Sequence, residues 1–176
     1  MRTRVGYAGG STANPTYQSI GDHSETIEIT YDPTVISYDE LLAVFWASGA
    51  GRLAGTLRQY APIIHYHDEA QREVAENSLV AEEARSGRVL SVDIQPAGTF
   101  YQAEAYHQKY YLRGLRVVAA EYEALYPTLE AFVGSTAVAR ANGYVGGYGL
   151  RADLEVEIGD LGLSEKAQAT LLRAAR

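Results

Sequence analysis

Two hydrophobic spacings alternate along the first two-thirds of the chain. In residues 25–31, Ile27, Ile29 and Tyr31 occupy every second position and polar residues lie between them. This period of two predicts a strand with one buried side. Asp32-Pro33 ends the pattern. Three further strands are predicted at residues 3–7, 63–66 and 89–95.

Two helices are predicted between these strands, each opened by a capping box. Ser37 precedes Glu40 by three residues, and apolar side chains follow at helical spacing. Asp68 and Gln71 repeat the arrangement and open a helix that is expected to run to about Arg85, where Ser-Gly follows. Alternating strands and helices indicate an α/β or α+β unit.

The carboxy-terminal third has a helical or irregular pattern. A helix is predicted over residues 119–125, ending near Pro127, and another from a Ser135 cap to Asn142-Gly143. Residues 143–149 are predicted to form a loop, and Ser164 is expected to cap a last helix over residues 165–176. We therefore expect a main domain at residues 1–127 and a helical extension at residues 128–176 packed on it.

Composition narrows the function classes. The net charge is −7 and no basic run occurs, so nucleic acid and anionic membrane surfaces are poor candidate partners. The apolar runs are too short to cross a bilayer, and we expect a soluble cytoplasmic protein. The chain contains no cysteine, which excludes disulfides, thiolate metal sites and thiol chemistry by its own side chains.

Glu25 is the first candidate for chemistry. It shares strand parity with Ile27 and Ile29, so its carboxyl is predicted to point to the buried side. Burial without a cation raises a carboxyl pKa and favours the neutral form, which suits a general acid. The alternative is a carboxylate at the strand edge that tilts into water.

Two tyrosines are candidates to assist such an acid. Tyr17 closes the segment Asn-Pro-Thr-Tyr in the loop before the Glu25 strand, and proline stiffens that turn. Tyr60 lies just before the strand at residues 63–66. Phenol hydroxyls beside a neutral carboxyl would offer several donors to a polar oxygen. For each tyrosine, simple packing is the alternative.

The histidines raise the question of a metal site. His65 and His67 are two positions apart on a predicted strand and so share a face, and His23 or His107 could complete a set. Zinc requires three or four ligands, and nothing in the spacing supplies them. We expect no metal, and structural hydrogen bonds for these rings.

Six segments, in order, resemble the A-type peptide methionine sulfoxide reductases. They are "VGYAGG", "NPTY", "GDHSETIEITYDP", "ISYDELLAVFW", "RQYAPIIHYHDEAQ" and "FYQAEAYHQKYYL". The resemblance implies an α/β fold, an α+β two-layer sandwich with a ferredoxin-like core and a mixed sheet. It also implies reduction of methionine-S-sulfoxide, free or in peptides, as a protein-repair activity under oxidative stress. No bound cofactor is implied, only thioredoxin or another thiol as external reductant.

The resemblance also assigns roles to residues. Glu25 falls on the family's general acid, and Tyr17 and Tyr60 fall on the two tyrosines that donate to the sulfoxide oxygen. His23 and His107 fall in segments that imply substrate binding. The assignment agrees with the acid and the two phenols inferred from the residues themselves.

The chain departs from the family pattern at the nucleophile. The family's "G-C-F-W-G" block belongs ahead of "VGYAGG" and is absent, so we expect the reading frame to continue upstream of Met1 and to encode it. The family's acidic residue before Tyr60 is also missing, with Gly55 near its place. Two alternatives remain open: a cysteine-free, non-catalytic relative that binds methionine sulfoxide or a protein partner, and a metal-dependent hydrolase that uses His65 and His67.

Overall fold

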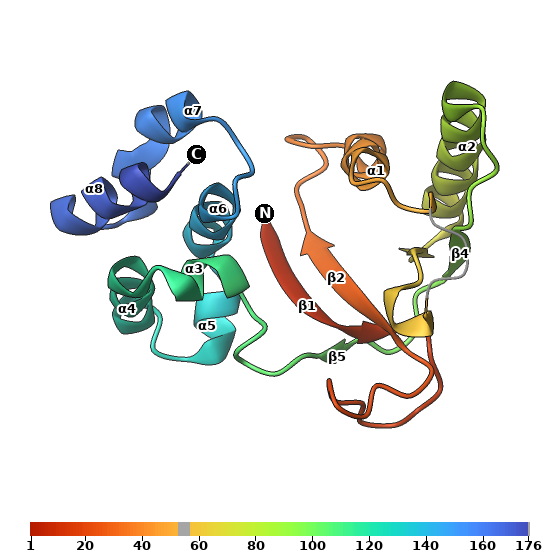
Figure 1. Ribbon diagram of the computed structural model, residues 1–176, viewed down its shortest axis with the longest axis horizontal. Coiled ribbons are helices and arrows are strands. Elements are labelled where there is room, and N and C mark those ends of the chain that lie inside the picture. The colour runs from red at the N-terminus through yellow and green to blue at the C-terminus, as the bar shows by residue number, and fades with distance from the viewer. Residues whose placement is uncertain (53–56, 176) are drawn as a thin grey trace. The chain divides into compact units, whose positions relative to one another are not determined.

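The computed structural model describes residues 1–52 and 57–175 and confirms the predicted α/β class, with small sheets and many helices (Figure 1). The chain forms two compact units. The strand unit comprises Val5–Ile27 and Tyr31–Ala103, and the helical unit comprises Met1–Arg4, Glu28–Thr30 and Glu104–Arg176. These spatial units divide the chain elsewhere than at residue 127, and the predicted boundary of the family domain stays a prediction.

One sheet has the strand order β2-β1-β5. Its strands are β1 (Arg2–Ala8), β2 (Ser24–Thr30) and the short β5 (Tyr101–Gln102). β5 pairs antiparallel with β1, and Gly6 lies opposite Gln102. Both strands predicted in the first 31 residues are therefore present, within one or two residues of their expected ends.

The second sheet is a parallel pair, β3 (Ile63–Tyr66) and β4 (Asp93–Pro96), in which Ile64 lies opposite Ile94. The connection between them contains α2 (Glu69–Ser86), and α1 (Tyr38–Ala47) packs against α2. A small core joins these elements. Its buried members are Leu42, Trp46, Ile64, Ala75 and Leu90.

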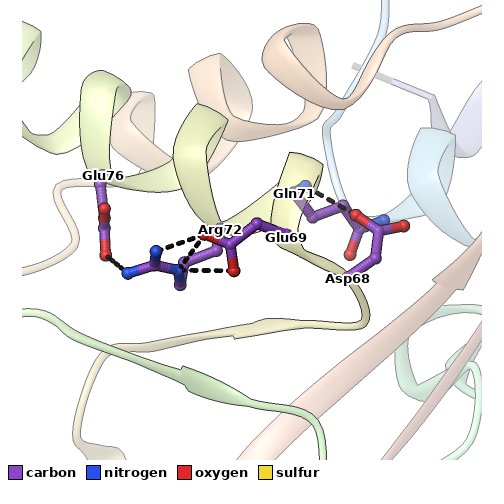
Figure 2. Close-up of polar contacts among 5 residues, drawn as sticks. All are labelled: Asp68, Glu69, Gln71, Arg72 and Glu76. Atoms are coloured by element: carbon purple, nitrogen blue, oxygen red, sulfur yellow. Dashed lines mark hydrogen bonds and ion pairs between the residues drawn. The ribbon is translucent and has the colours of Figure 1, made fainter.

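Local capping sets the limits of α1 and α2. Ser37 and Glu40 form the predicted capping box at the start of α1. At the start of α2, Asp68 accepts from Gln71 N as predicted, but the Gln71 side chain accepts from His67 N instead of the backbone N–H of Asp68. Figure 2 shows Arg72 between two carboxylates of α2, Glu69 and Glu76. These exposed ion pairs contribute little to stability.

The helical unit contains six α-helices and the 3-10 turn η2 (Ile158–Leu161) within its described residues, with a core of aliphatic and aromatic side chains such as Leu112, Phe132 and Leu154. The buried Tyr122 hydroxyl donates to Leu161 O at 3.0 Å. The helices are α3 (Tyr110–Gly114), α4 (Arg116–Leu125), α5 (Leu129–Gly134), α6 (Thr136–Val145), α7 (Arg151–Glu157) and α8 (Glu165–Ala174).

Some of the predicted element limits were wrong. α6 continues through Asn142-Gly143 to Val145, because buried Ala141 and Tyr144 keep that turn against the core. The strand predicted from residue 89 begins only at Asp93; the apolar side chain of Leu90 is buried in the core without strand pairing. β3 ends at Tyr66, as predicted, so His67 lies outside the strand, and the expectation that His67 shares a strand face with His65 was wrong. Gly55 and the predicted end of α8 at residue 176 lie outside the described residues.

No helix within the described part of the chain is both long and apolar enough to span a bilayer.

Lys109 is a buried cation in the helical unit. Its Nζ donates to Thr3 O and to Thr3 Oγ1, both at 2.7 Å. Burial lowers the pKa of Lys109 to about 8. A neutral amine retains two N–H bonds, which match the two oxygen acceptors.

This environment predicts a pH dependence of stability. The folded pKa lies below the ordinary value of 10.5, so the unfolded chain binds more protons between pH 8 and 10.5. The Lys109 contribution to the free energy of unfolding should therefore rise with pH across that window. Urea denaturation of Lys109→Met should show a flatter pH profile than the parent. The exposed Lys166→Met is the matched control, and equal slopes for parent and Lys109→Met would contradict the prediction.

Candidate functional site

The loop that carries Tyr17 is closed at its base by Asp22. The Asp22 carboxylate accepts from Ser11 N at 2.8 Å, Ser11 Oγ at 2.9 Å, Thr12 N at 3.0 Å and Thr12 Oγ1 at 2.7 Å. These hydrogen bonds, led by the Thr12 hydroxyl, hold the pKa of Asp22 well below its usual range. A residue with a side chain would not fit at Gly10, because its Cβ would lie 2.7 Å from His23 N.

His23 completes this closure from the buried side. Its side chain is 1% exposed; Nδ1 accepts from Gly10 N at 3.1 Å, and Nε2 lies 2.8 Å from Thr12 O. A backbone N–H requires an acceptor and a carbonyl requires a donor, so this ring is the neutral tautomer protonated on Nε2. Both nitrogens hold the loop, and the expected role of His23 in substrate binding stays a prediction.

Glu25 does not face a buried side, so that part of the sequence interpretation was wrong. The general-acid role of Glu25 stays a prediction and rests on the family resemblance rather than on burial. Glu25 is exposed, Ile27 two residues later is 56% exposed, and the neighbouring Ser24 is buried. At Glu25 and Ile27 the side assigned to the core is exposed, whereas Ile29 on the same side is half-buried. The Glu25 carboxylate has a specific partner there, because Gln59 Nε2 donates to Glu25 Oε1 at 2.7 Å.

Tyr17, Tyr60 and Glu25 lie close together. The pKa of Tyr60 is raised, chiefly by the neighbouring Tyr17 phenol and then by desolvation, by the Glu25 carboxylate and by a hydrogen bond with the Tyr17 side chain. Tyr17 is 42% exposed and Tyr60 is 55% exposed. The structure thus brings the three residues selected from the sequence to one open surface.

Arg58 fixes the 3-10 turn η1 (Arg58–Tyr60) beside the base of the loop. Its guanidinium donates to Gly9 O at 2.8 Å and to Asp22 O at 3.1 Å, and it pairs with Asp93 Oδ2 at 3.3 Å. The Arg58 carbonyl accepts from Ser24 Oγ at 2.5 Å. Arg58 therefore links η1 to Asp22 and Ser24, the residues on either side of His23.

Arg58→Met should lower the free energy of unfolding by about 1–2 kcal/mol, because the Gly9 and Asp22 carbonyls lose a shared donor. Arg58→Lys should restore little of the lost stability, since one ammonium lacks the planar set of donors that reaches three groups. Urea denaturation measures both effects. Arg88→Met, on an exposed arginine of the same unit, is the control. A parental midpoint for Arg58→Met would show that the guanidinium contacts carry no stability.

The remaining histidines do not form a metal centre in the structure as described. Burial, followed by the Arg58 charge, lowers the pKa of His65, and His67 is exposed. Within residues 1–52 and 57–175, no three His, Asp or Glu side chains gather closely enough to hold a metal ion. His107 belongs to the helical unit, where its ring centroid lies 4.2 Å from that of Tyr106 and its Nε2 lies 4.0 Å from Glu104 Oε2. Its expected role in substrate binding stays a prediction.

Sequence reasoning missed two residues of this site, Arg58 and Gln59. Both belong to the quoted segment "RQY", but their partners lie 34 to 49 residues away along the chain. Only the adjacency to Tyr60 could have drawn attention to them.

Comparison with known proteins identifies the family of this chain. The family model described as "Peptide methionine sulfoxide reductase" matches residues 1–133. The chain belongs to the peptide methionine sulfoxide reductase family. The family match includes Tyr17, Glu25 and Tyr60, the three side chains that the structure brings together.

Individual members of the peptide methionine sulfoxide reductase family match well. A peptide methionine sulfoxide reductase of Drosophila melanogaster is 43% identical over 166 residues, which is 93% of this chain and 66% of that protein. Peptide methionine sulfoxide reductase A5 of Oryza sativa subsp. japonica is 44% identical over 121 residues, 64% of this chain and 47% of that protein. The chain thus spans about half to two thirds of the length of these relatives. The Drosophila match also extends beyond the residues that the family model covers.

A solved structure supports the fold. Methionine sulfoxide reductase A of Corynebacterium diphtheriae superposes with a TM-score of 0.52 and 30% identity, covering 63% of this chain and 62% of that one.

Proposed function

We propose that this chain provides the oxygen-recognition part of a peptide-methionine (S)-S-oxide reductase. The observation that carries the proposal is the group formed by Glu25, Tyr17 and Tyr60 on an exposed surface, in a member of this family. An acid and two phenols offer the donors that a sulfoxide oxygen accepts. The open position of both phenols suits methionine sulfoxide within peptides as well as the free amino acid.

The overall reaction converts a sulfoxide and two thiols into a thioether, a disulfide and water. A thiolate attacks the sulfoxide sulfur, the sulfur–oxygen bond breaks, and the oxygen passes through a sulfenic acid before it leaves as water. Glu25 supplies a proton to that oxygen, and Tyr17 and Tyr60 hold it by hydrogen bonds. No side chain of this sequence supplies the thiolate, because the chain has no cysteine.

We also propose a thioredoxin-type dithiol as the source of electrons and the cytoplasm as the compartment. Reduced thiols are maintained there, which the regeneration of a sulfenic acid requires. No resident cofactor is needed for this chemistry, since the dithiol supplies both electrons.

The chain alone should not turn over a methionine sulfoxide peptide with thioredoxin or dithiothreitol. No other side chain present is a comparable soft nucleophile. Thioether release is followed by chromatography against a blank without protein. Release above that blank by pure protein would contradict the prediction and the thiolate assignment with it.

The absence of cysteine favours one other candidate function, a non-catalytic relative that binds methionine sulfoxide. Both candidates require the oxygen site to bind its ligand. NMR titration of the chain with N-acetyl-methionine-S-sulfoxide methylamide should shift Tyr17 and Tyr60 ring signals, and the corresponding thioether should not. If neither ligand shifts them, both candidate functions are wrong. A chimera with a relative's cysteine-bearing segment ahead of Met1 distinguishes the two candidate functions, because only the reductase hypothesis predicts turnover.

A further inference from the structure

We propose that Gln59 is a positioning residue for Glu25: its side-chain amide holds one carboxyl oxygen and leaves the other to face the sulfoxide oxygen. This inference rests on the proposed function and adds a residue to that site. Glu25 Oε1 accepts from Gln59 Nε2 at 2.7 Å.

The chemistry of the amide determines where the proton of Glu25 resides. The Gln59 NH₂ group only donates, so the oxygen that it contacts must act as an acceptor. When Glu25 is protonated, this contact favours the proton on Oε2, because the carbonyl oxygen is the better acceptor. The amide does not titrate, so it orients the carboxyl without competing for that proton.

The backbone that carries Gln59 is held in place through the neighbouring residue, Arg58. The Arg58 carbonyl accepts from Ser24 Oγ at 2.5 Å, and Ser24 directly precedes Glu25. The Ser24–Arg58 and Glu25–Gln59 contacts are thus consecutive links between the start of β2 and η1. Tyr60 follows Gln59 in the same turn, so one short segment sets the positions of both the carboxyl and a phenol.

The competing explanation is an ordinary surface hydrogen bond. Glu25 is exposed, and polar contacts in water contribute little to stability. If Gln59 positions Glu25, loss of this hydrogen bond should change the side-chain rotamer of Glu25 and weaken the binding of a sulfoxide. The unfolding midpoint should change little.

The first experiment needs no ligand. In the ¹³C- and ¹⁵N-labelled chain, the three-bond couplings of Glu25 should report one dominant χ1 rotamer. Gln59→Met keeps the side-chain length but removes the donor, and it should average these couplings. Gln102→Met, on an exposed glutamine of β5, should leave them unchanged. Averaged couplings already in the parent, or unchanged couplings in Gln59→Met, would overturn the proposal.

The second experiment measures affinity for N-acetyl-methionine-S-sulfoxide methylamide by NMR titration of the same proteins. Gln59→Met should bind about 3- to 10-fold more weakly, the range expected for one lost hydrogen bond, and Gln102→Met should bind like the parent. Equal affinity of Gln59→Met and parent would overturn the positioning role. A parent that does not bind would instead reject the proposed function, while the rotamer experiment would still decide whether Gln59 orients Glu25.

Discussion

Glu25→Gln is expected to slow the sulfoxide reduction step by ~10²–10⁴-fold, the usual contribution of general acid catalysis. The amide keeps the shape of the side chain and still donates a hydrogen bond, but it cannot deliver a proton to the departing oxygen. Because Glu25 is exposed, stability should change little. The measurement is single-turnover reduction of a sulfoxide peptide, across a pH series, by a chimera that carries a relative's cysteine-bearing segment ahead of Met1.

Three variants define the specificity of this result. Tyr17→Phe and Tyr60→Phe should each slow reduction less, because the acid and the second phenol remain. Glu28→Gln is the matched control on the same strand; it changes only the half-buried ion pair with Arg4. If Glu25→Gln reduces substrate at the parental rate near neutral pH, another group is the acid and the assignment of Glu25 is wrong.

His23→Ala should lower the free energy of unfolding by about 3–5 kcal/mol. The substitution leaves Gly10 N–H and Thr12 C=O without their partners and removes a buried ring. These two groups are at the base of the loop that carries Tyr17, so the Tyr17–Tyr60 contact should weaken as well. Urea denaturation followed by circular dichroism measures the first effect, and the NMR signals of the two tyrosine rings report the second.

His23→Gln is the second variant of this test, to be compared with His23→Ala. Its amide offers one donor and one acceptor, so it should recover part of the lost stability. His67→Ala, on an exposed histidine of the same unit, should have little effect. A parental midpoint for His23→Ala would show that the two ring contacts do not stabilise the loop.

Local signals in the sequence predicted much of the strand unit. The period-two pattern at Ile27 and Ile29 located β2, and Ser37-Glu40 located the start of α1, because both signals depend on residues a few positions apart. The mixed α/β class followed from their order. The apolar alternation of β2 could not reveal which side is open, since the same pattern serves either case.

The remaining errors have a common physical origin in tertiary contacts. Asn142-Gly143 is a sound stop signal, but packing of Tyr144 in the helical core carries α6 one turn further. Tyr17, Glu25 and Tyr60 were candidates from their positions along the chain, and the family motifs assigned their roles. Arg58 and Gln59 were missed because their importance comes from partners distant along the chain, which spacing does not record.

The closure at Gly10, Asp22 and His23 makes the intervening segment an exchangeable module. Its two ends are joined by contacts among themselves, as in an Ω-loop, so residues 13–16 and 18 at its tip can change without altering the base, provided that Tyr17 is kept. Loops from other family members could therefore be grafted between the same anchors to vary the groups that surround a bound sulfoxide. Libraries confined to this tip would explore peptide-sequence preference on an unchanged scaffold.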